Sequence, residues 1–531
     1  MKITLPKNKL PALSNVLLVL LAAILLILSF PDFEYSVLAW VALIPLFAAV
    51  EREKESPRKS FFLGWIFGTC FFFGTCWWLT YAPIHYAAFS PFLAHFLMFC
   101  VALTVGIFPA AFCTLFSVLL KRLGNYAIFA APFLWVAIEF ARFLVTGNNW
   151  NAIGYSQAFR SSPVRLASIG GVYLVSFLMI LINSFFAFKL MNIILPAKNG
   201  AKIQRKDWLI LASAFFVIAL MFSISEFILK KSRASLESSF VVAVQPNVPM
   251  SGIKYEDRAS LRDRHARLAE QALQKIEGRT GKPTVVIFPE SPMIFLYSED
   301  AEFREFLKRF ASKNNASVLF NSAEPDAKTT QSFNSAVMVD QKGEKIAQYD
   351  KIYLLPFGEF QPLPDFIASN IPGFVGSFSF GDEYDLLPFG DAKGGVMICF
   401  ESHFGSLSRE YTRRGADFLI EMTNDGYLGK TPVLRQHLAN SVFRAVETNR
   451  PLIRVTNVGV TAYINERGEI LDEAEVYTES ARAWTVSKSD ASETFYVRYG
   501  EWFAWLCSIV SLALLFFSFW KKNSREKAQN A

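Results

Sequence analysis

The segment GGVMICFES, residues 394–402, joins a short apolar run to a cysteine and then to a glutamate. The apolar run predicts a buried strand that ends at Cys399. The chain has six cysteines, and the other five lie in or beside long apolar segments. A cysteine at the end of a buried strand is either a small hydrophobic side chain or a nucleophile. The segment alone leaves both interpretations open.

Around this segment, predicted strands alternate with predicted helices between residues 238 and 495. The predicted strands are SSFVVAVQPNVP, PTVVIFPES, SVLFNSAE, GGVMICFES and DFLIEMTND. Two hairpins are also predicted, one turning at Lys342 and Gly343 and the other near Asn457 and Gly459. This alternation is typical of an α/β fold in which helices cover a sheet, and the hairpins add antiparallel strands to that sheet.

Three of the predicted strands end at a residue that can take part in catalysis. Glu290 ends TVVIFPE, Lys351 ends KIAQYDK, and Cys399 ends GGVMIC. Reactive groups of α/β folds tend to lie at the carboxyl ends of strands. A carboxylate with a raised pKa can remove the thiol proton, and an ammonium can stabilise the thiolate and then an oxyanion. Together the three residues are sufficient for acyl transfer through a thioester.

Each of these residues also has an ordinary structural interpretation. Cys399 could fill a core, Glu290 could cap the following turn, and Lys351 could form a surface pair with Asp350. These structural interpretations are less favoured than a catalytic one, because all three residues fall at strand ends within one domain.

The remainder of the chain is strongly apolar. Of the 531 residues, 52% are hydrophobic and 19% are charged, which favours a membrane protein. Stretches of about 20 apolar residues can cross a bilayer. Eight spans are predicted, at residues 12–30, 34–50, 61–81, 90–119, 126–145, 166–195, 208–229 and 502–520. We therefore expect a transmembrane region of seven helices at 1–237, a catalytic domain at 238–495, and a final transmembrane helix with a basic tail at 496–531.

The basic residues of the short loops predict the orientation of the chain. They place both termini in the cytoplasm and the domain at 238–495 outside, because cytoplasmic loops are enriched in Lys and Arg. One cluster, Lys230, Lys231 and Arg233, then leaves the membrane on the outer side, but large domains cross largely regardless of charge. The net charge of +7 is attributed to this topology and gives no indication of nucleic-acid binding. An unpaired thiol facing outward risks oxidation, which disfavours an idle Cys399.

The segments FPES, YDKIYLLPFGEF and GGVMICFES resemble, in order and spacing, the three signatures of the nitrilase superfamily. With membrane spans before and after the domain, the whole chain resembles the apolipoprotein N-acyltransferase family of that superfamily. VQPNVP, TNDGYLG and YGEW extend the resemblance. The resemblance implies a nitrilase-like αββα sandwich domain on an eight-helix transmembrane bundle. It also implies a bacterial inner membrane protein whose catalytic domain faces the periplasm.

The same resemblance implies roles for individual residues. Cys399 matches the nucleophile, Glu290 the general base, and Lys351 the cation that stabilises the oxyanion. Four further residues match supporting positions, namely Glu359, Glu401, Phe400 and Tyr255.

The residues at the supporting positions also have structural interpretations or depart from the family pattern. Glu359 could instead be a structural carboxylate bonded to loop N–H groups. Glu401 would point to the same side as Cys399 on a strand-like path, or it could cap a helix near residue 404. Phe400 replaces a frequent Tyr of the family and lacks its hydroxyl, and Tyr255 replaces a frequent Trp and lacks its indole N–H.

The implied reaction is a ping-pong acyl transfer. Cys399 takes an acyl chain from a membrane phospholipid, with phosphatidylethanolamine as the expected donor. The chain then passes to the α-amine of the S-diacylglyceryl cysteine of an apolipoprotein. The resemblance implies no cofactor, and the three histidines of the domain (His265, His403 and His437) lack the spacing of metal ligands. The nearly uncharged segment 360–381 is interpreted as a lid that contacts the membrane, or as a loop packed on its own domain.

Two other functions are compatible with the sequence. A membrane-tethered carbon–nitrogen hydrolase would use the same three residues, with water attacking the thioester. A non-catalytic scaffold would keep the fold without needing Cys399. The hydrolase gives no reason for eight spans or for an apolar lid, and the scaffold predicts that Cys399→Ser leaves function intact.

Overall fold

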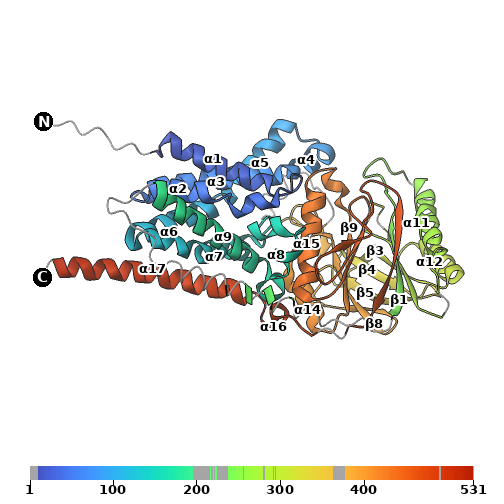
Figure 1. The fold of residues 1–531 in the computed structure, drawn as a ribbon. Helices are drawn as coiled ribbons and strands as arrows, with labels where there is room; N and C mark the ends of the chain where they lie inside the picture. Colours follow the sequence, from blue (N-terminus) through green and yellow to red (C-terminus); the bar gives the residue numbers. More distant parts are fainter. Residues whose placement is uncertain are drawn as a thin grey trace. The chain divides into compact units, whose positions relative to one another are not determined.

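The structure, a computed structural model, describes residues 10–194, 216, 219–220, 222–223, 226 and 237–529, apart from 255, 279–280, 291, 294, 363–376 and 490–491. The chain divides into two compact units. The first comprises residues 1–84, 88–224 and 501–531, and the second comprises residues 85–87 and 225–500. Figure 1 shows helices throughout the first unit and strands with helices on either side in the second. The predicted span at 208–229 lies almost wholly outside the described residues.

The first unit is helical. Its α-helices are α1 (Leu13–Leu28), α2 (Ile44–Arg52), α3 (Pro57–Cys76), α4 (Tyr81–Tyr86), α5 (Pro91–Val105), α6 (Ile107–Leu123), α7 (Ala131–Thr146), α8 (Ser161–Val164), α9 (Ala167–Ile194) and α17 (Trp502–Gln529). Short 3₁₀ helices connect some of them, at Ser36–Trp40 (η1), Trp77–Thr80 (η2), Asn125–Ala130 (η3) and Ile153–Gln157 (η4).

Five helical segments among the described residues are long and apolar enough to cross a membrane. They are Pro57–Tyr86, Pro91–Leu123, Asn125–Thr146, Ala167–Leu190 and Trp502–Trp520, and each coincides with a predicted span. Helix α1 is apolar but has only 16 residues. The predicted span at 34–50 is divided into η1 and α2, because Pro45 in the first turn of α2 suits the start of a helix and not its middle. The total of eight spans remains a prediction.

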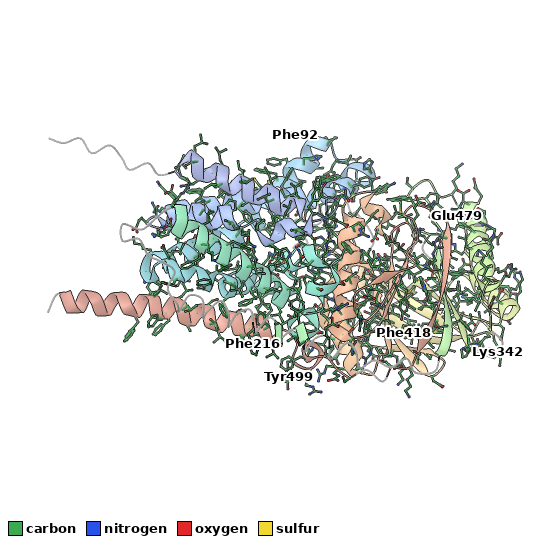
Figure 2. All side chains as sticks on the ribbon, viewed as in Figure 1. Phe92, Phe216, Lys342, Phe418, Glu479 and Tyr499 are labelled. Atoms are coloured by element: carbon green, nitrogen blue, oxygen red, sulfur yellow. The ribbon has the colours of Figure 1, made fainter. Side chains whose placement is uncertain are left out.

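In the first unit, both the core and the outer surface carry apolar side chains. On α1, Val19 and Leu26 are fully buried, whereas Leu13 is 74% exposed. Phe92 on α5, labelled in Figure 2, is 82% exposed, and Phe516 on α17 is 74% exposed. The outer face of a helix in a water-soluble bundle is normally polar. Apolar side chains on both faces are therefore the pattern that a bilayer requires.

The second unit contains two sheets. The strand order of the first is β13-β1-β2-β3-β4-β5, with β6 beside β4, and that of the second is β12-β11-β10-β9-β8-β7. The first sheet consists of β1 (Glu237–Gln245), β2 (Thr284–Ile287), β3 (Ser317–Pro325), β4 (Ser332–Val339), β5 (Lys345–Asp350), β6 (Phe378–Ser379) and β13 (Ser480–Ser487). The second consists of β7 (Leu386–Phe389), β8 (Ala392–Ile398), β9 (Phe418–Thr423), β10 (Leu452–Thr456), β11 (Ala462–Ile464) and β12 (Ile470–Leu471).

Helices cover the outer face of each sheet. Helices α11 (Asp257–Leu273) and α12 (Ala301–Asn314) pack on the first sheet, and α14 (Gly405–Arg413) and α15 (Val433–Thr448) pack on the second. The short α16 (Phe495–Tyr499) contacts α14 and α15. Figure 1 shows the strands between these two pairs of helices. The arrangement is the expected αββα sandwich.

The inner faces of the two sheets meet, and hydrogen bonds join them as well as apolar contacts. Strands β1 and β10 pack together, as do β5 and β7. The Ser239 hydroxyl on β1 donates to the carbonyl of Phe389 on β7 at 2.7 Å, and both residues are buried. The distance between the sheets is therefore fixed by specific contacts.

Local sequence signals account for the elements near the site. Gly343 lies at the turn between β4 and β5 with φ of 79°, a conformation that glycine adopts without strain. A Cβ there would lie 2.6 Å from the Cα of Lys308. Strands β4 and β5 pair antiparallel, as do β10 and β11. Both predicted hairpins are therefore confirmed.

Candidate active site

Cys399 lies directly after β8 and begins the 3₁₀ helix η5 (Cys399–His403). Its φ of 53° lies in the left-handed region. Such a conformation costs about 1–3 kcal/mol for a residue with a side chain, and it persists only where the surroundings hold it. A sharp turn from strand to helix presents a side chain at the sheet edge, which suits a nucleophile. Cys399 is half-buried at the edge of the sheet, which favours a nucleophile over a core residue.

Glu290 lies three residues beyond β2, and its carboxylate is close enough to Lys351 and Cys399 for both to lower its pKa. Its Oε1 atom also accepts from Nδ2 of Asn334, and its Oε2 atom from the backbone N–H of Asn424, both at 3.2 Å. Burial raises the pKa of Glu290, Lys351 lowers it, and Glu359 raises it further, with a net shift upward. A carboxylate with a raised pKa that contacts the thiol is suited to accept the thiol proton.

Lys351 lies directly after β5 and is 1% exposed. Its Nζ atom is 2.8 Å from both carboxylate oxygens of Glu359. Burial opposes the charged form, but Glu359 and Glu290 outweigh it and raise the pKa of Lys351 above its usual value. Lys351 is therefore a buried ammonium, and the alternative of a surface pair with Asp350 is wrong.

The protonation state of Cys399 follows from the groups around it. Burial and the charge of Glu290 raise the pKa of the Cys399 thiol well above its usual value. Lys351 and a hydrogen bond from Thr423 oppose this shift without cancelling it. The resting side chain is thus a thiol, and its proton must leave as the sulfur attacks.

Glu359 connects the cation to the rest of the site. Besides Lys351, its Oε1 atom accepts from Nδ2 of Asn334 at 2.7 Å. Its Oε2 atom accepts from the backbone N–H of Leu355 at 2.7 Å, within its own loop. Glu359 therefore bonds both to a loop N–H group and to a residue of the candidate catalytic set.

Glu401 is fully buried and accepts four hydrogen bonds. Its Oε1 atom accepts from the Tyr349 hydroxyl at 2.7 Å and from the N–H groups of Ile352 and Tyr353 at 2.7 and 3.0 Å. Its Oε2 atom accepts from the N–H of Ile398 at 2.8 Å. Burial raises the pKa of Glu401 to about 7 against the opposing effect of Lys351 and these bonds. Glu401 thus ties the loop after Lys351 to the residue before Cys399.

The strand-like path expected for Glu401 is wrong, because residues 399–403 form the 3₁₀ helix η5. Glu401 does cap a helix, but the helix is η5 and not the one that begins at Gly405, because its carboxylate accepts from the N–H of Ile398, the N-cap residue of η5. Phe400, in the same helix, is partly exposed. Its ring stacks on His403 at 5.7 Å and meets Phe404 edge-on at 5.2 Å.

We predict that Glu401→Gln lowers both stability and acylation. The amide nitrogen would face a backbone N–H, leaving a buried donor without an acceptor at a cost of about 1–3 kcal/mol. Denaturant unfolding of the purified chain and single-turnover acylation of Cys399 would measure the two effects. Glu410→Gln, on the outer surface of α14, is the matched control. Equal stability and acylation in Glu401→Gln and the control would contradict the prediction.

Asn334 on β4 is a site residue that the sequence analysis did not identify. Its amide contacts both Glu290 and Glu359, and its Oδ1 atom accepts from Nδ2 of Asn321 at 2.6 Å. Strand β4 begins SFNS, so other polar residues lie close to Asn334 and no local signal distinguishes it. Tyr255 lies outside the described residues, as do residues 363–376 of the segment interpreted as a lid.

A cysteine, a carboxylate and a lysine at strand ends of an αββα sandwich define the class of thiol-dependent carbon–nitrogen hydrolase folds. Residues 241–494 match the family model described as carbon-nitrogen hydrolase, and residues 22–185 match the apolipoprotein N-acyltransferase N-terminal domain. The chain is 30% identical over 500 residues to apolipoprotein N-acyltransferase of Geobacter metallireducens, covering 92% of each chain. It therefore belongs to the apolipoprotein N-acyltransferase family.

Other known proteins are also similar. The apolipoprotein N-acyltransferase of Thermotoga maritima is 27% identical over 524 residues, covering 95% of this chain and 94% of that protein. Among solved structures, Saccharomyces cerevisiae Nit3 has 19% identity and a TM-score of 0.37, covering 48% of this chain and 93% of its own. An amidase of Nesterenkonia AN1 has 18% identity and the same TM-score, covering 50% and 95%.

Proposed function

We propose that this chain transfers an acyl chain from a membrane phospholipid, through a thioester on Cys399, to the N-terminal α-amine of a diacylated apolipoprotein. This is the last step of bacterial lipoprotein maturation. The observation that carries the proposal is that Cys399, Glu290 and the buried ammonium of Lys351 meet at the strand ends, where each of them shifts the pKa of the other two. The family to which the chain belongs supplies the two substrates, an apolipoprotein and a membrane lipid.

In the first half-reaction, Glu290 accepts the thiol proton while the Cys399 sulfur attacks the ester carbonyl of the phospholipid. A C–S bond forms, and the carbonyl oxygen becomes an oxyanion. Lys351 and the backbone N–H of Phe400 stabilise that oxyanion, an effect of about 3–4 kcal/mol for one donor. The ester C–O bond then breaks, and the leaving oxygen takes the proton from Glu290. Lysophospholipid departs and the thioester remains.

In the second half-reaction, the neutral α-amine of the S-diacylglyceryl cysteine attacks the thioester carbonyl. Glu290 accepts a proton from the attacking nitrogen, and the same donors stabilise the second oxyanion. The C–S bond breaks, an amide is formed, and the Cys399 sulfur regains a proton from Glu290. The enzyme returns to its starting state, so one group serves as base and acid in both halves.

Exposed apolar side chains near Lys351 support a lipid as the acyl donor. Leu355 is 37% exposed, Phe357 53% and Phe380 54%, and all three follow Lys351 in the chain. Apolar side chains exposed close together indicate a surface that contacts a lipid or another apolar partner. We propose phosphatidylethanolamine as the donor, with its sn-1 chain transferred.

The proposal includes a location for the reaction. We propose that the chain lies in the inner membrane with both termini in the cytoplasm and the domain at 238–495 in the periplasm. The charges of the predicted loops support this orientation. Within it, residues 1–237 and 496–531 supply the membrane helices.

Analysis of lipoprotein N-termini by mass spectrometry in cells depleted of this protein tests the function. We expect lipoproteins with a free α-amine to accumulate in these cells. Expression of the native gene should restore N-acylation. Triacylated N-termini in the depleted cells would contradict the transferase. Release of free fatty acid from phosphatidylethanolamine by the purified chain, with no product on an added lipopeptide, would instead identify a hydrolase.

Glu290→Gln is expected to slow thioester formation by about 10²–10⁴-fold, because the amide cannot accept the thiol proton. In the native chain the rate should fall as pH falls through the raised pKa of Glu290, since the protonated carboxyl is no longer a base. Single-turnover rates on the Cys399 peptide between pH 4 and 8 would measure both effects. An unchanged acid limb in Glu290→Gln would show that another group is the base.

A further inference from the structure

A buried group of charged residues lies behind Cys399 and has no part in the mechanism above. We call it the His437 cluster, and its members are Glu421 on β9, Asp425 in the 3₁₀ helix η6 (Asp425–Leu428), His437 on α15 and Arg454 on β10. Arg454 and Glu421 are 0% exposed, and the other two are at most 4% exposed. Buried charges of this kind are costly unless they are paired.

The contacts within the His437 cluster pair every charge. Nδ1 of His437 lies 2.7 Å from Oδ1 of Asp425, and Nε2 lies 3.0 Å from Oε1 of Glu421. Nη2 of Arg454 lies 2.7 Å from Oδ2 of Asp425, and Nη1 contacts Glu421. With His437 protonated, the two cations balance the two carboxylates.

One contact connects this cluster to the nucleophile. Nε2 of His437 donates a hydrogen bond to the backbone carbonyl oxygen of Cys399 at 3.1 Å. Cys399 is the residue with the left-handed φ of 53°. The His437 ring therefore holds the carbonyl of the very residue whose backbone conformation needs support.

The geometry of the peptide bond extends this effect to the next residue. A trans peptide is planar, and its C=O and N–H groups point in opposite directions. A carbonyl of Cys399 that points into the His437 cluster therefore directs the N–H of Phe400 away from it. That N–H is the backbone donor assigned to the oxyanion in the proposed mechanism, so His437 fixes the direction of that donor.

The partners of His437 also determine its protonation state. Carbonyl and carboxylate oxygens only accept, so both ring nitrogens must carry hydrogen, which makes His437 an imidazolium. The charged and titratable groups facing it are Glu421 from β9, Asp425 from η6, Arg454 from β10 and Cys399 from η5. Burial lowers the pKa of His437, but Glu421 and Asp425 outweigh it and raise that pKa to about 9.

We propose that His437, held as an imidazolium by Glu421 and Asp425, is a positioning residue that fixes the Cys399–Phe400 peptide and thereby the oxyanion-binding N–H of Phe400. This inference rests on the proposed function, because it assigns a role within the first half-reaction. A neutral imidazole has one N–H. With that hydrogen kept on Nδ1 toward Asp425, Nε2 no longer donates to the Cys399 carbonyl. Thioester formation should therefore fall as pH rises through about 9.

The test uses the full chain in nanodiscs that contain phosphatidylethanolamine, without lipopeptide, so that titration of the acceptor amine does not contribute. The rate of thioester formation is measured on the Cys399 peptide by mass spectrometry from pH 6 to 10.5. His437→Ala is expected to reduce this rate on the order of 100-fold, with the half-saturating phospholipid concentration nearly unchanged. His437→Gln, whose amide can still donate to the carbonyl, should recover part of the rate and show no alkaline fall.

Glu421→Gln provides the second variant. It keeps an oxygen toward His437 and Arg454 but removes one negative charge, so the pKa of His437 should fall and the alkaline limb should move to lower pH. Ionisation of the Cys399 thiol would instead raise the rate with pH, which is the opposite sign. His265→Gln is the matched control, because His265 is a fully buried histidine on α11 that contacts neither Cys399 nor the cluster in the described contacts.

The outcomes separate the two proposals. Absence of a thioester on native Cys399 would overturn the proposed function. If the native thioester forms, the inference fails where folded His437→Ala acylates within about threefold of the control. It also fails where the alkaline limb of folded Glu421→Gln coincides with that of the native chain. If His437→Ala does not fold, the pH profile of Glu421→Gln decides.

Discussion

Replacing Cys399 with serine is expected to lower acylation of a diacylated lipopeptide by at least ~10⁴-fold. The hydroxyl of serine is a far weaker acid than a thiol, and Glu290 is too weak a base to ionise it. Phosphatidylethanolamine and the lipopeptide should both still bind, because the side chains differ by one atom. The loss should therefore fall on the rate of thioester formation and not on substrate affinity.

The measurement is mass spectrometry of the lipopeptide product over time with purified full-length chain. Cys100→Ser on α5 is the matched control, because Cys100 is also a partly exposed cysteine and lies in the helical unit. Its activity should equal that of the native chain. Retention of function in cells that carry only the Cys399→Ser chain would favour the scaffold interpretation and would exclude a thioester route.

Lys351→Met should have two separable effects, one on catalysis and one on stability. Loss of the cation proposed to stabilise the oxyanion should reduce thioester formation by about 10²–10³-fold. The side chain is 1% exposed and is bonded to Glu359, so its removal leaves a buried carboxylate without its counter-ion. Breaking a buried pair in this way costs about 3–5 kcal/mol of stability.

The double variant Lys351→Met with Glu359→Gln separates these effects. The neutral amide removes the uncompensated charge, so most of the lost stability should return, while acylation should stay low because no cation has been restored. Chemical denaturation and single-turnover acylation are the two measurements. Recovery of acylation in the double variant would show that Lys351 acts only through stability.

The main features of this site could be predicted from the sequence because they depend on where strands end. Apolar runs locate the strands, and the next polar residues, Glu290, Lys351 and Cys399, then fall at sheet edges. The two hairpins could also be predicted, because the need for glycine at a turn is local to the sequence. That Glu290, Lys351 and Cys399 would act on a lipid could be predicted only with a second, independent signal, which is the apolar half of the chain.

Features that depend on tertiary contacts could not be predicted in this way. The left-handed turn at Cys399 bends the chain into η5 and redirects Glu401, so extrapolating the strand gave the wrong path. Asn334 acts through carboxylates 25 and 44 residues away in the sequence, and nothing local marks such contacts. The burial of Lys351 likewise results from the fold around Glu359.

The two sheets of the sandwich carry different parts of the chemistry. Glu290 and Lys351 follow strands of the first sheet, whereas Cys399 follows a strand of the second. The proposed proton transfer from Cys399 to Glu290 would therefore cross from one layer to the other, and its distance would depend on how closely the two sheets pack. Contacts between the two sheets, such as the hydrogen bond from Ser239 to Phe389, help to set the distance between Cys399 and Glu290. Substitutions that only loosen this packing can slow catalysis while leaving every reactive side chain in place.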